Sequence, residues 1–363
     1  MGADLRPEWR PGWAVHPGDL LVEALEERTM SQAELARRMG RPIKTINEIV
    51  KHKQAITPET ALQLETVLRI PAHFWINLQS AFDEKEARRR VSDRLAAELS
   101  WLHRFPIAVM AKRGWISRFD DPILQLQELL SFFGVASPEV WRQQWASAPA
   151  SFRQSGSFRS KPEAVSAWLR QAERRAEVIA CEPYNEAVLK AALPKIRAMT
   201  KLDVGIFLPQ LETLLATCGV ALVVVPELPG THLSGATRWI GTRKALVALS
   251  LRHKTDDHFW FALFHELGHV LAGRNSHLDD ARPEERLQAI EEAEADQFAS
   301  RQLVPDETLA ELEEPYVLGP ELIRDVAARL GISPGIVVGR LEHKLGISPA
   351  RFRYLKRTWT WAE

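Results

Sequence analysis

The sequence predicts an α+β protein that is mostly helical, with one small β-sheet in its C-terminal half. Helical patterns of apolar residues fill residues 16–218, and several begin with a Thr-Pro, Ser-Pro or Lys-Pro pair. Three short apolar runs then follow at residues 220–225, 233–240 and 245–251, with turn residues between them. A helical pattern returns at Asp256 and continues to the C-terminus, so three predicted strands lie between long helical regions.

Length, charge and cysteine content limit the class of protein. A chain of 363 residues corresponds to two or three domains on the usual ~150-residue prior. Lys+Arg and Asp+Glu both total 47, so any nucleic-acid footprint must be local. The two cysteines, Cys181 and Cys218, form neither a ligand cluster nor a disulfide framework, which fits a reducing compartment. No signal core or run of about 18 apolar residues occurs, so we expect a soluble cytoplasmic protein without a membrane partner.

The N-terminal region has the pattern of two short helices joined at a glycine turn. Ser31 and Glu34 form a capping box, in which the serine oxygen accepts from an amide and the glutamate reaches back. Gly40 ends this helix, and a second helix follows over residues 42–51. Its inward residues are expected to be Ile43, Ile46 and Val50. A third helix begins at Thr57-Pro58, which completes a helix-turn-helix bundle.

Basic residues gather in this pair of helices. Between residues 37 and 53 there are six of them, with Glu48 the single acid: Arg37, Arg38, Arg41, Lys44, Lys51 and Lys53. Phosphate contacts would come from this excess, to which Lys51 belongs. Base-edge contacts would come from the start of the second helix, from Arg41, Lys44, Thr45 and Asn47. The alternative is a helical bundle with a solvated basic face.

Residues 16–82 resemble a known family in many positions. The stretch HPGDLLVEALEERTMSQAELARRMGRPIKTINEIVKHKQAITPETALQLETVL, followed by FWINLQ, looks like the HigA-type antitoxins of the phage-repressor (XRE) helix-turn-helix family. The resemblance implies operator DNA as a partner, repression of the protein's own promoter, and binding commonly as a homodimer.

The chemical centre of the sequence is His265-Glu266-Leu267-Gly268-His269, an H-E-x-x-H motif. On a helix the two histidines lie about 40° apart and one turn apart, so both imidazoles can reach one metal ion. Glu266 projects beside them and can act as general base on a water molecule at the metal. Thr255, two aspartates and Gly273 mark the ends of the expected helix. The alternative is a helix with two core histidines.

A catalytic zinc site needs a third protein ligand. A helical pattern over residues 287–304 offers several acids. Glu292 is best placed, because it shares one inward stripe with Asp296 and apolar residues, whereas Glu294 lies on a polar stripe and is the second choice. Asp296, one turn after Glu292, can hold a ligand histidine in place. The alternative for these acids is a charged helix face.

The order of strands, H-E-x-x-H helix and acidic helix is typical of zinc peptidases whose third ligand is glutamate. In such enzymes the substrate backbone pairs along the sheet edge. The segment PELPGTHLSGATRWIGTRKALVALSLRHKTDDHFWFALFHELGHVLAG, continued by EEAEADQFASRQLVP, resembles the ImmA/IrrE metallopeptidases over residues 220–305. The resemblance implies a zincin-like domain, Zn²⁺ held by His265, His269 and Glu292, Glu266 as base, and a phage-type repressor as substrate. Oxyanion stabilisation stays open among His277, Arg238 and Tyr316.

We therefore predict five regions: a helix-turn-helix domain at residues 1–82, a charged helical connector at 83–99, a helical middle region at 100–218, a zinc peptidase core at 219–310 and a helical C-terminal region at 311–363. The predicted function is a DNA-binding regulator with zinc-dependent endopeptidase activity. One alternative is a transcription factor whose peptidase-like domain senses a ligand or partner without proteolysis. Another is an antitoxin, which the long C-terminal region disfavours.

Overall fold

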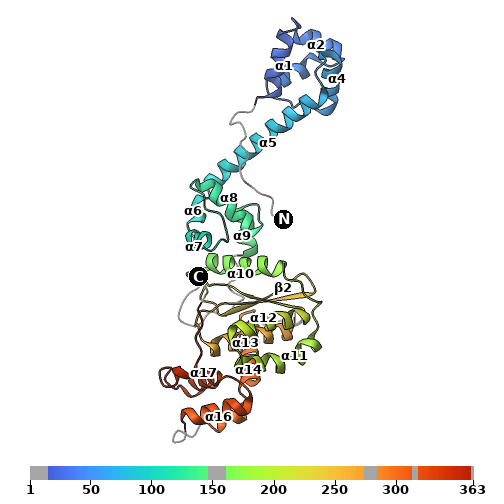
Figure 1. Ribbon diagram of the computed structural model, residues 1–363. Helices are drawn as coiled ribbons and strands as arrows, with labels where there is room; N and C mark the ends of the chain where they lie inside the picture. The colour runs from blue at the N-terminus through green and yellow to red at the C-terminus, as the bar shows by residue number, and fades with distance from the viewer. Residues whose placement is uncertain (1–14, 146–160, 274–283, 313–317, 361–363) are drawn as a thin grey trace. The chain divides into compact units, whose positions relative to one another are not determined.

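A computed structural model of the protein describes residues 15–145, 161–273, 284–312 and 318–360, with the backbone alone over residues 284–288. By its internal contacts the chain divides into two units, residues 1–99 and residues 100–363. Within the described residues, no helix combines the length and apolar character needed to cross a membrane. The predicted α+β class is confirmed, since the described residues form many helices and one three-stranded sheet (Figure 1).

In its described residues the N-terminal unit consists of helices joined by short loops and turns. They are α1 (Pro17–Glu26), α2 (Gln32–Met39), α3 (Ile43–Val50), α4 (Pro58–Leu68) and α5 (Ala72–Ala96). Leu21, Leu35, Leu64 and Trp75 are fully buried between them and form the core of this unit. The expected connector at residues 83–99 coincides largely with the second part of α5, which is one unbroken helix.

Two details of this unit differ from the sequence prediction. The Ser31 hydroxyl caps α2 by accepting from the amide of Glu34, as predicted. The Glu34 carboxylate does not reach back, however, because it binds the guanidinium groups of Arg37 and Arg38. The prediction that Ile43 faces inward is also wrong: its side chain is 49% exposed. Ile46 and Ile49, three residues apart, take the buried positions of α3 instead.

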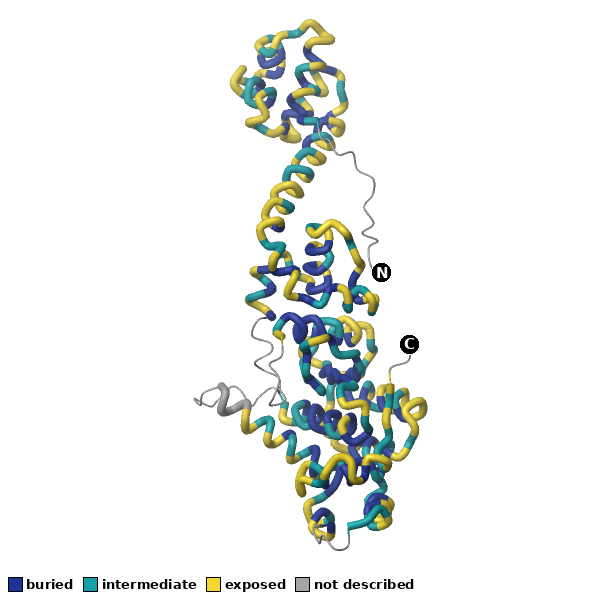
Figure 2. The backbone as a smooth tube through the Cα atoms, turned by 90° about the vertical axis from the view of Figure 1, so that its left-hand side faces the viewer, coloured by how far each residue is buried: buried dark blue, intermediate teal, exposed yellow. Residues whose placement is uncertain are grey.

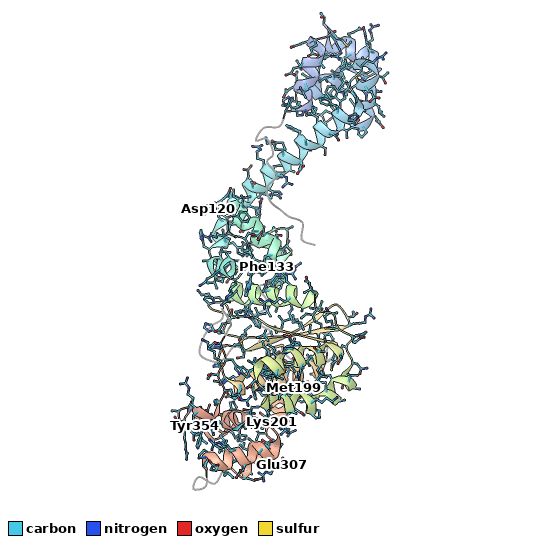
Figure 3. All side chains as sticks on the ribbon, viewed as in Figure 1. Asp120, Phe133, Met199, Lys201, Glu307 and Tyr354 are labelled. Atoms are coloured by element: carbon cyan, nitrogen blue, oxygen red, sulfur yellow. The ribbon has the colours of Figure 1, made fainter. Side chains whose placement is uncertain are left out.

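The second unit begins with α6 (Leu99–Leu102), α7 (Ile107–Lys112), α8 (Pro122–Phe133) and α9 (Pro138–Trp145). Edge-to-face aromatic contacts hold these helices together, with ring centroids 4.7–6.0 Å apart. The rings belong to Trp101, Phe105, Phe133 and Trp141, and Phe133 is labelled among the side chains of Figure 3. This cluster gives the short helices an apolar core of their own.

The sheet has three strands, β1 (Val220–Val224), β2 (Gly235–Ile240) and β3 (Lys244–Leu249), in the spatial order β1-β3-β2. The central strand β3 pairs parallel with β1 and antiparallel with β2. β3 is buried along nearly its whole length because helices cover both faces of the sheet. The three predicted strands are confirmed, and β2 is an edge strand of the described sheet.

Helices cover the sheet on both sides. α10 (Pro162–Glu177) lies against one face, and α12 (Val204–Thr217) and α13 (Asp256–Ala272) lie against the other (Figure 1). The indole N–H of Trp168 on α10 donates to the carbonyl of Val225, 3.1 Å away, at the end of β1. Figure 2 shows many of the buried residues in these stacked layers, so the sheet and α13 form the centre of the unit.

The remaining helices of this unit contribute to the same hydrophobic core as α13. They are α11 (Glu186–Ala198), η2 (Met199–Lys201), α14 (Glu284–Leu303), α15 (Asp306–Ala310), α16 (Pro320–Leu330), α17 (Pro334–Leu345) and η4 (Arg353–Leu355). Of these, α14 and α17 contact α13 most extensively. The helix that carries the H-E-x-x-H motif therefore lies between the sheet on one side and two C-terminal helices on the other.

The start of α13 is fixed by buried carboxylates rather than by a hydroxyl cap. Thr255 occupies the N-cap position, but its hydroxyl contacts His258 Nδ1 at 2.9 Å. The Asp256 carboxylate accepts from the Ser333 hydroxyl at 2.7 Å and from the backbone amide of Arg357 at 3.0 Å. Asp256 is fully buried, so these bonds satisfy a charge that water cannot reach.

A second buried carboxylate, Asp257, binds Lys356 Nζ at 2.8 Å, and Glu342 binds the same ammonium at 2.6 Å. The three side chains are at most 14% exposed. Removing one partner of such a pair leaves an uncompensated charge, which costs ~3–5 kcal/mol. Segments near the C-terminus thereby hold the first turn of α13 in place.

Candidate functional site

The two histidines of the H-E-x-x-H motif lie one turn apart on α13, as the spacing predicts. Their ring centroids are 4.8 Å apart, and the planes of the rings are nearly perpendicular. Nε2 of His265 faces Nε2 of His269 at 3.1 Å. His265 is buried and His269 is half-buried, so the two nitrogen lone pairs can converge on one point at the edge of the helix.

Glu292 on α14 approaches the same point. One carboxylate oxygen lies 3.4 Å from Nε2 of His265, and the other lies 3.4 Å from Nε2 of His269. Each of the three residues offers one donor atom, and these atoms all lie within 4.8 Å of one another. Glu294, the second choice, is exposed. The structure therefore brings together the three residues that the sequence analysis proposed as ligands.

Gly268 explains how α14 comes close enough to α13. A Cβ atom at this position would lie 3.2 Å from a ring carbon of Phe298 and 3.3 Å from the Cα of Ala295. These distances are tighter than ordinary van der Waals contact. The glycine and the small Ala295, which is buried, let the two backbones approach and place Glu292 opposite the histidines.

Asp296 orients one of the imidazoles. Its Oδ1 lies 2.9 Å from Nδ1 of His265. A proton on Nδ1 then donates to the carboxylate, which leaves Nε2 with its lone pair directed at Glu292 and His269. The position of Asp296 thus agrees with the supporting role that the sequence analysis assigned to it.

Glu266 lies beneath the edge strand of the sheet. It is 6% exposed, and its Oε2 accepts a hydrogen bond of 2.7 Å from the Thr237 hydroxyl on β2. Gly235, two residues earlier on the same face of β2, gives the carboxylate its space: a Cβ there would lie 2.6 Å from Glu266 Oε1. The edge strand therefore holds this carboxylate in position.

The site carries strong negative potential. Burial acts to lower the pKa of His265, but hydrogen bonds to Asp296 and Glu292 outweigh it and raise that pKa to about 9. Burial acts to raise the pKa of Glu292, but the two histidines hold it at about 2. Burial raises the pKa of Glu266. Positive charge between the imidazoles and the carboxylates is therefore stabilised, whether a proton or a metal ion supplies it.

The donor set fits zinc. Two imidazole nitrogens and one carboxylate are the ligands of many catalytic zinc sites. Tetrahedral zinc with bonds of about 2.0–2.1 Å separates its ligand atoms by roughly 3.3–3.4 Å. The separations here are 3.1 Å between the imidazole nitrogens and 3.4 Å from each of them to a Glu292 oxygen. The chain can thus present three ligands to one ion without rearrangement.

The candidates for oxyanion stabilisation are reduced to residues that the structure does not describe. Arg238 is not placed to stabilise an oxyanion near Glu266. It follows Thr237 on β2 and therefore points to the opposite face of the sheet from Glu266. There its guanidinium pairs with Glu173 of α10 at 2.5 Å and lies over the Trp145 ring. His277 and Tyr316 lie outside the described residues.

Sequence reasoning missed Thr237 and Gly235, which touch Glu266. Their alternation on one face of β2 is visible in the sequence as a spacing of two. Nothing in the sequence, however, shows which face of the strand covers the H-E-x-x-H helix, because both faces of this sheet are covered by helices.

The expected DNA-contacting residues lie on α3 and just before and after it. Lys44 is 81% exposed and lies 3.7 Å from Glu48. Thr45 and Asn47 are half-buried and Lys51 is exposed. The Arg41 guanidinium lies back on α4, where Nε donates to the side-chain oxygen of Gln63. Accessible surface thus remains on four of the five expected contact residues: Lys44, Thr45, Asn47 and Lys51. A base contact by Arg41 would replace its bond to Gln63.

Comparison with known proteins identifies two domains. Residues 21–75 match a family model described as helix-turn-helix, and residues 223–342 match the M78 peptidase model, described as IrrE N-terminal-like domain. Over 75 residues the chain is 37% identical to the uncharacterized HTH-type transcriptional regulator YddM of Escherichia coli (strain K12). This aligned region covers 21% of this chain and 80% of that protein.

Two further similarities fall in the N-terminal region. Virulence-associated protein I of Dichelobacter nodosus is 38% identical over 77 residues, which is 21% of this chain and 71% of that protein. A solved structure of Pseudomonas aeruginosa antitoxin HigA with the higBA promoter is 32% identical over 24% of this chain and 95% of that chain, with a TM-score of 0.23.

The placement of the acids on α14 predicts which of them binds metal. Glu292→Gln should lower zinc affinity by at least about 10- to 100-fold, because it removes a charged donor from a set of three. Glu294→Gln, the matched control on the exposed face, should bind zinc as wild type does. Titration against a zinc chelator measures both, and equal affinities for the two variants would remove Glu292 from the ligand set.

Proposed function

Because the chain belongs to the helix-turn-helix transcriptional regulators and carries an IrrE N-terminal-like domain of the M78 peptidases, we propose that it combines operator binding with zinc-dependent endopeptidase activity. The proposed substrate is a phage-type repressor, whose cleavage relieves repression under stress or mobile-element control. The observation that carries the enzymatic part is the cluster of His265, His269 and Glu292 beside the buried carboxylate of Glu266.

In this proposal His265, His269 and Glu292 hold the ion, and Asp296 keeps the His265 ring in its orientation. A zinc ion, when bound, supplies a Lewis acid that polarises the scissile carbonyl and acidifies the attacking water. Glu266 is the residue that moves protons: its carboxylate takes one from the attacking water and gives it to the leaving amine. Burial, which raises the pKa of Glu266, brings it closer to the range in which a carboxyl does both.

The edge strand β2 gives the substrate a place to bind. It is an edge strand of the described sheet, and an extended segment of a repressor can add to such a strand by main-chain hydrogen bonds. The same strand holds Glu266 through Thr237. A substrate that pairs with β2 would therefore be placed relative to the base by one rigid element.

The assignment of Glu266 as the base predicts that one substitution can abolish repressor cleavage without abolishing zinc binding. Glu266→Gln should retain zinc, because Glu266 is not among the three donors, and should lower cleavage of a cognate repressor by at least about 10³-fold. A repressor encoded beside this protein is incubated with the zinc-loaded protein, and mass spectrometry of the repressor measures its cleavage. Glu294→Gln is the matched control and should cut normally. A Glu266→Gln variant as active as wild type would disprove the assignment. A wild type that holds zinc but cuts no repressor would favour the alternative in which the domain is a sensor.

The Thr237 contact predicts an effect on the rate rather than on substrate affinity. Thr237→Val keeps the shape of the side chain but removes the hydrogen bond to Glu266, so kcat should fall about 10-fold with little change in KM. Thr237→Ser keeps the hydroxyl and should restore most of the rate. If the serine variant is as slow as the valine variant, the hydroxyl is not what holds the base.

The exposed start of α3 predicts a separate effect on DNA. Asn47→Ala should weaken binding to promoter DNA by about 10-fold through loss of a base contact. Lys44→Ala should remove one phosphate contact. The plot of log affinity against log salt concentration should therefore become less steep by about one unit of slope. Both variants should cleave as wild type does. Gel-shift titration at several fixed salt concentrations checks this, with Lys190→Ala on α11 as control. Unchanged affinity in both variants would contradict the proposed interface.

A further inference from the structure

Basic residues gather in the C-terminal part of the second unit. Between residues 340 and 360 there are six of them and one acid, Glu342, which is the same ratio as in residues 37–53. The chain as a whole has a net charge of zero, so this local excess marks a region that attracts anions. The six residues are Arg340, Lys344, Arg351, Arg353, Lys356 and Arg357.

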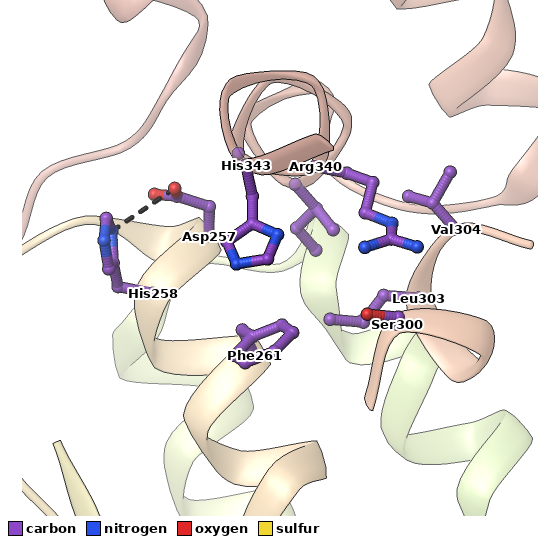
Figure 4. Close-up of a pocket in the computed structure, with 10 residues that line it drawn as sticks. Asp257, His258, Phe261, Ser300, Leu303, Val304, Arg340 and His343 are labelled. Carbon is purple, nitrogen blue, oxygen red and sulfur yellow. Dashed lines mark ion pairs between the residues drawn. The ribbon is translucent and has the colours of Figure 1, made fainter. Parts of the chain in front are cut away.

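Two of these cations serve the fold. Lys356 is paired with the carboxylates of Asp257 and Glu342. Arg340 is paired with Asp306 at 3.0 Å, and its side chain is only 13% exposed. Figure 4 shows Arg340 turned towards α14. The charges of these two residues are compensated inside the protein, so neither is available to an external anion.

The next three cations face solvent. Lys344, Arg351 and Arg353 are exposed, and within the described part of the chain none of them has an acidic partner. The Arg351 guanidinium donates to the carbonyl of Leu318 at 3.3 Å, a neutral acceptor that leaves its charge uncompensated. These side chains can therefore bind an anion without first breaking an ion pair.

Two lysines from other segments lie beside this stretch. Arg357 donates to the backbone carbonyl of Lys201 at 2.9 Å, and the amide of Trp359 donates to that of Lys254 at 2.8 Å. Both lysines are exposed, and Figure 3 labels Lys201. Asp203 lies 3.9 Å from the Arg357 guanidinium but is 87% exposed, so solvent screens this pair. We name the six accessible cations the C-terminal basic surface: Lys201, Lys254, Lys344, Arg351, Arg353 and Arg357.

The backbone that carries this surface is anchored. The amide of Arg357 donates to the Asp256 carboxylate, and the amide of Asp256 donates back to the carbonyl of Arg357, both at 3.0 Å. Phe352 is buried, and the Trp359 ring packs against that of Phe259 with the centroids 5.3 Å apart. The exposed cations thus extend from a fixed backbone, so less conformational freedom is lost when an anion binds.

The exposed aromatic residue of this segment is Tyr354, which follows Arg353. Its side chain is 65% exposed, and Figure 3 labels it at the margin of the unit. A tyrosine hydroxyl can donate to a phosphate oxygen. Proteins that hold single strands stack successive bases on several aromatic rings, whereas Phe352 and Trp359 pack against the core here. The described surface therefore suits the backbone of a duplex better than unpaired bases.

We propose that the C-terminal basic surface binds the phosphate backbone of duplex DNA that flanks the operator. The inference goes beyond the proposed peptidase activity and needs no metal ion, but its choice of DNA rests on the proposed operator binding by the first unit. Both surfaces belong to one chain, so DNA held by the first is at high effective concentration for the second. Phosphate contacts carry no sequence information. They keep the peptidase unit on the DNA to which a repressor binds.

The first test measures the surface without the operator. A duplex of unrelated sequence is titrated, at several salt concentrations, with the full chain carrying Lys44→Ala and Asn47→Ala, which weaken the first unit. Adding Lys254→Gln, Arg351→Gln and Arg353→Gln should make the plot of log affinity against log salt concentration less steep by about 2 to 3 units of slope. The matched control, which should keep the slope of the parent, removes three exposed cations elsewhere in the second unit: Lys112→Gln, Arg118→Gln and Lys195→Gln.

A slope that is unchanged by the three substitutions in the surface, or that falls equally in the control, would overturn the proposal. So would tighter binding of a single-stranded oligonucleotide than of the duplex through the same three residues. Arg351→Lys combined with Arg353→Lys keeps both charges and should keep the slope of the parent. A loss of slope in this variant would also count against the proposal, because the arginines would then act through the fold. Circular dichroism checks that each variant folds.

The second test joins both surfaces on one DNA. For the wild-type chain, promoter DNA with its flanking duplex should bind at least about 10-fold more tightly than a duplex trimmed to the operator. Substitution of Lys254, Arg351 and Arg353 by glutamine should shrink this gain to less than about 3-fold, with little change in affinity for the trimmed duplex. An undiminished gain would refute the surface. If promoter DNA binds no better than unrelated DNA, the proposed operator binding fails, and the first test still decides whether the surface holds DNA.

Discussion

The site depends on the close approach of two helices. α13 carries both imidazoles and α14 carries Glu292, so the distance between the helix axes decides whether three donors can share one ion. Gly268 and Ala295 set that distance, because a Cβ on the glycine would crowd the α14 backbone. Packed interiors resist small displacements, and this contact fixes the separations of 3.1–3.4 Å among the donors.

The first turn of α13 is held by residues far along the chain. Asp256 is bonded to Ser333 and to the amide of Arg357, and Asp257 is paired with Lys356. Buried carboxylates of this kind hold a fixed position when hydrogen bonds and ion pairs compensate their charge. The region after residue 318 is thus part of what positions the histidines, although it supplies none of the donors. The IrrE-like match, which ends at residue 342, includes Ser333 but neither Lys356 nor Arg357.

Much of this could be predicted from sequence, and the failures have a common cause. Spacing placed the two histidines correctly, because a helix has one periodicity. The inward stripe of α14 likewise singled out Glu292. A local pattern failed where a side chain had two partners to choose from, since Glu34 binds arginines rather than a backbone amide. Among the residues left open for the oxyanion, Arg238 faces α10. Which partner a side chain binds depends on which helices and strands pack together, and a single sequence does not show this packing.

The charge of the site connects its stability to its chemistry. Three carboxylates, from Glu266, Glu292 and Asp296, surround two imidazoles in a half-buried space. With neutral histidines, the carboxylates of Glu292 and Asp296 leave this cluster with an excess of negative charge, which partial burial makes unfavourable. Hydrogen bonds to Asp296 and Glu292 raise the pKa of His265, so the cluster favours a bound positive charge. A divalent cation satisfies the same demand and engages all three candidate ligands at once, so the arrangement that suits a peptidase is also one that a metal ion would stabilise against unfolding.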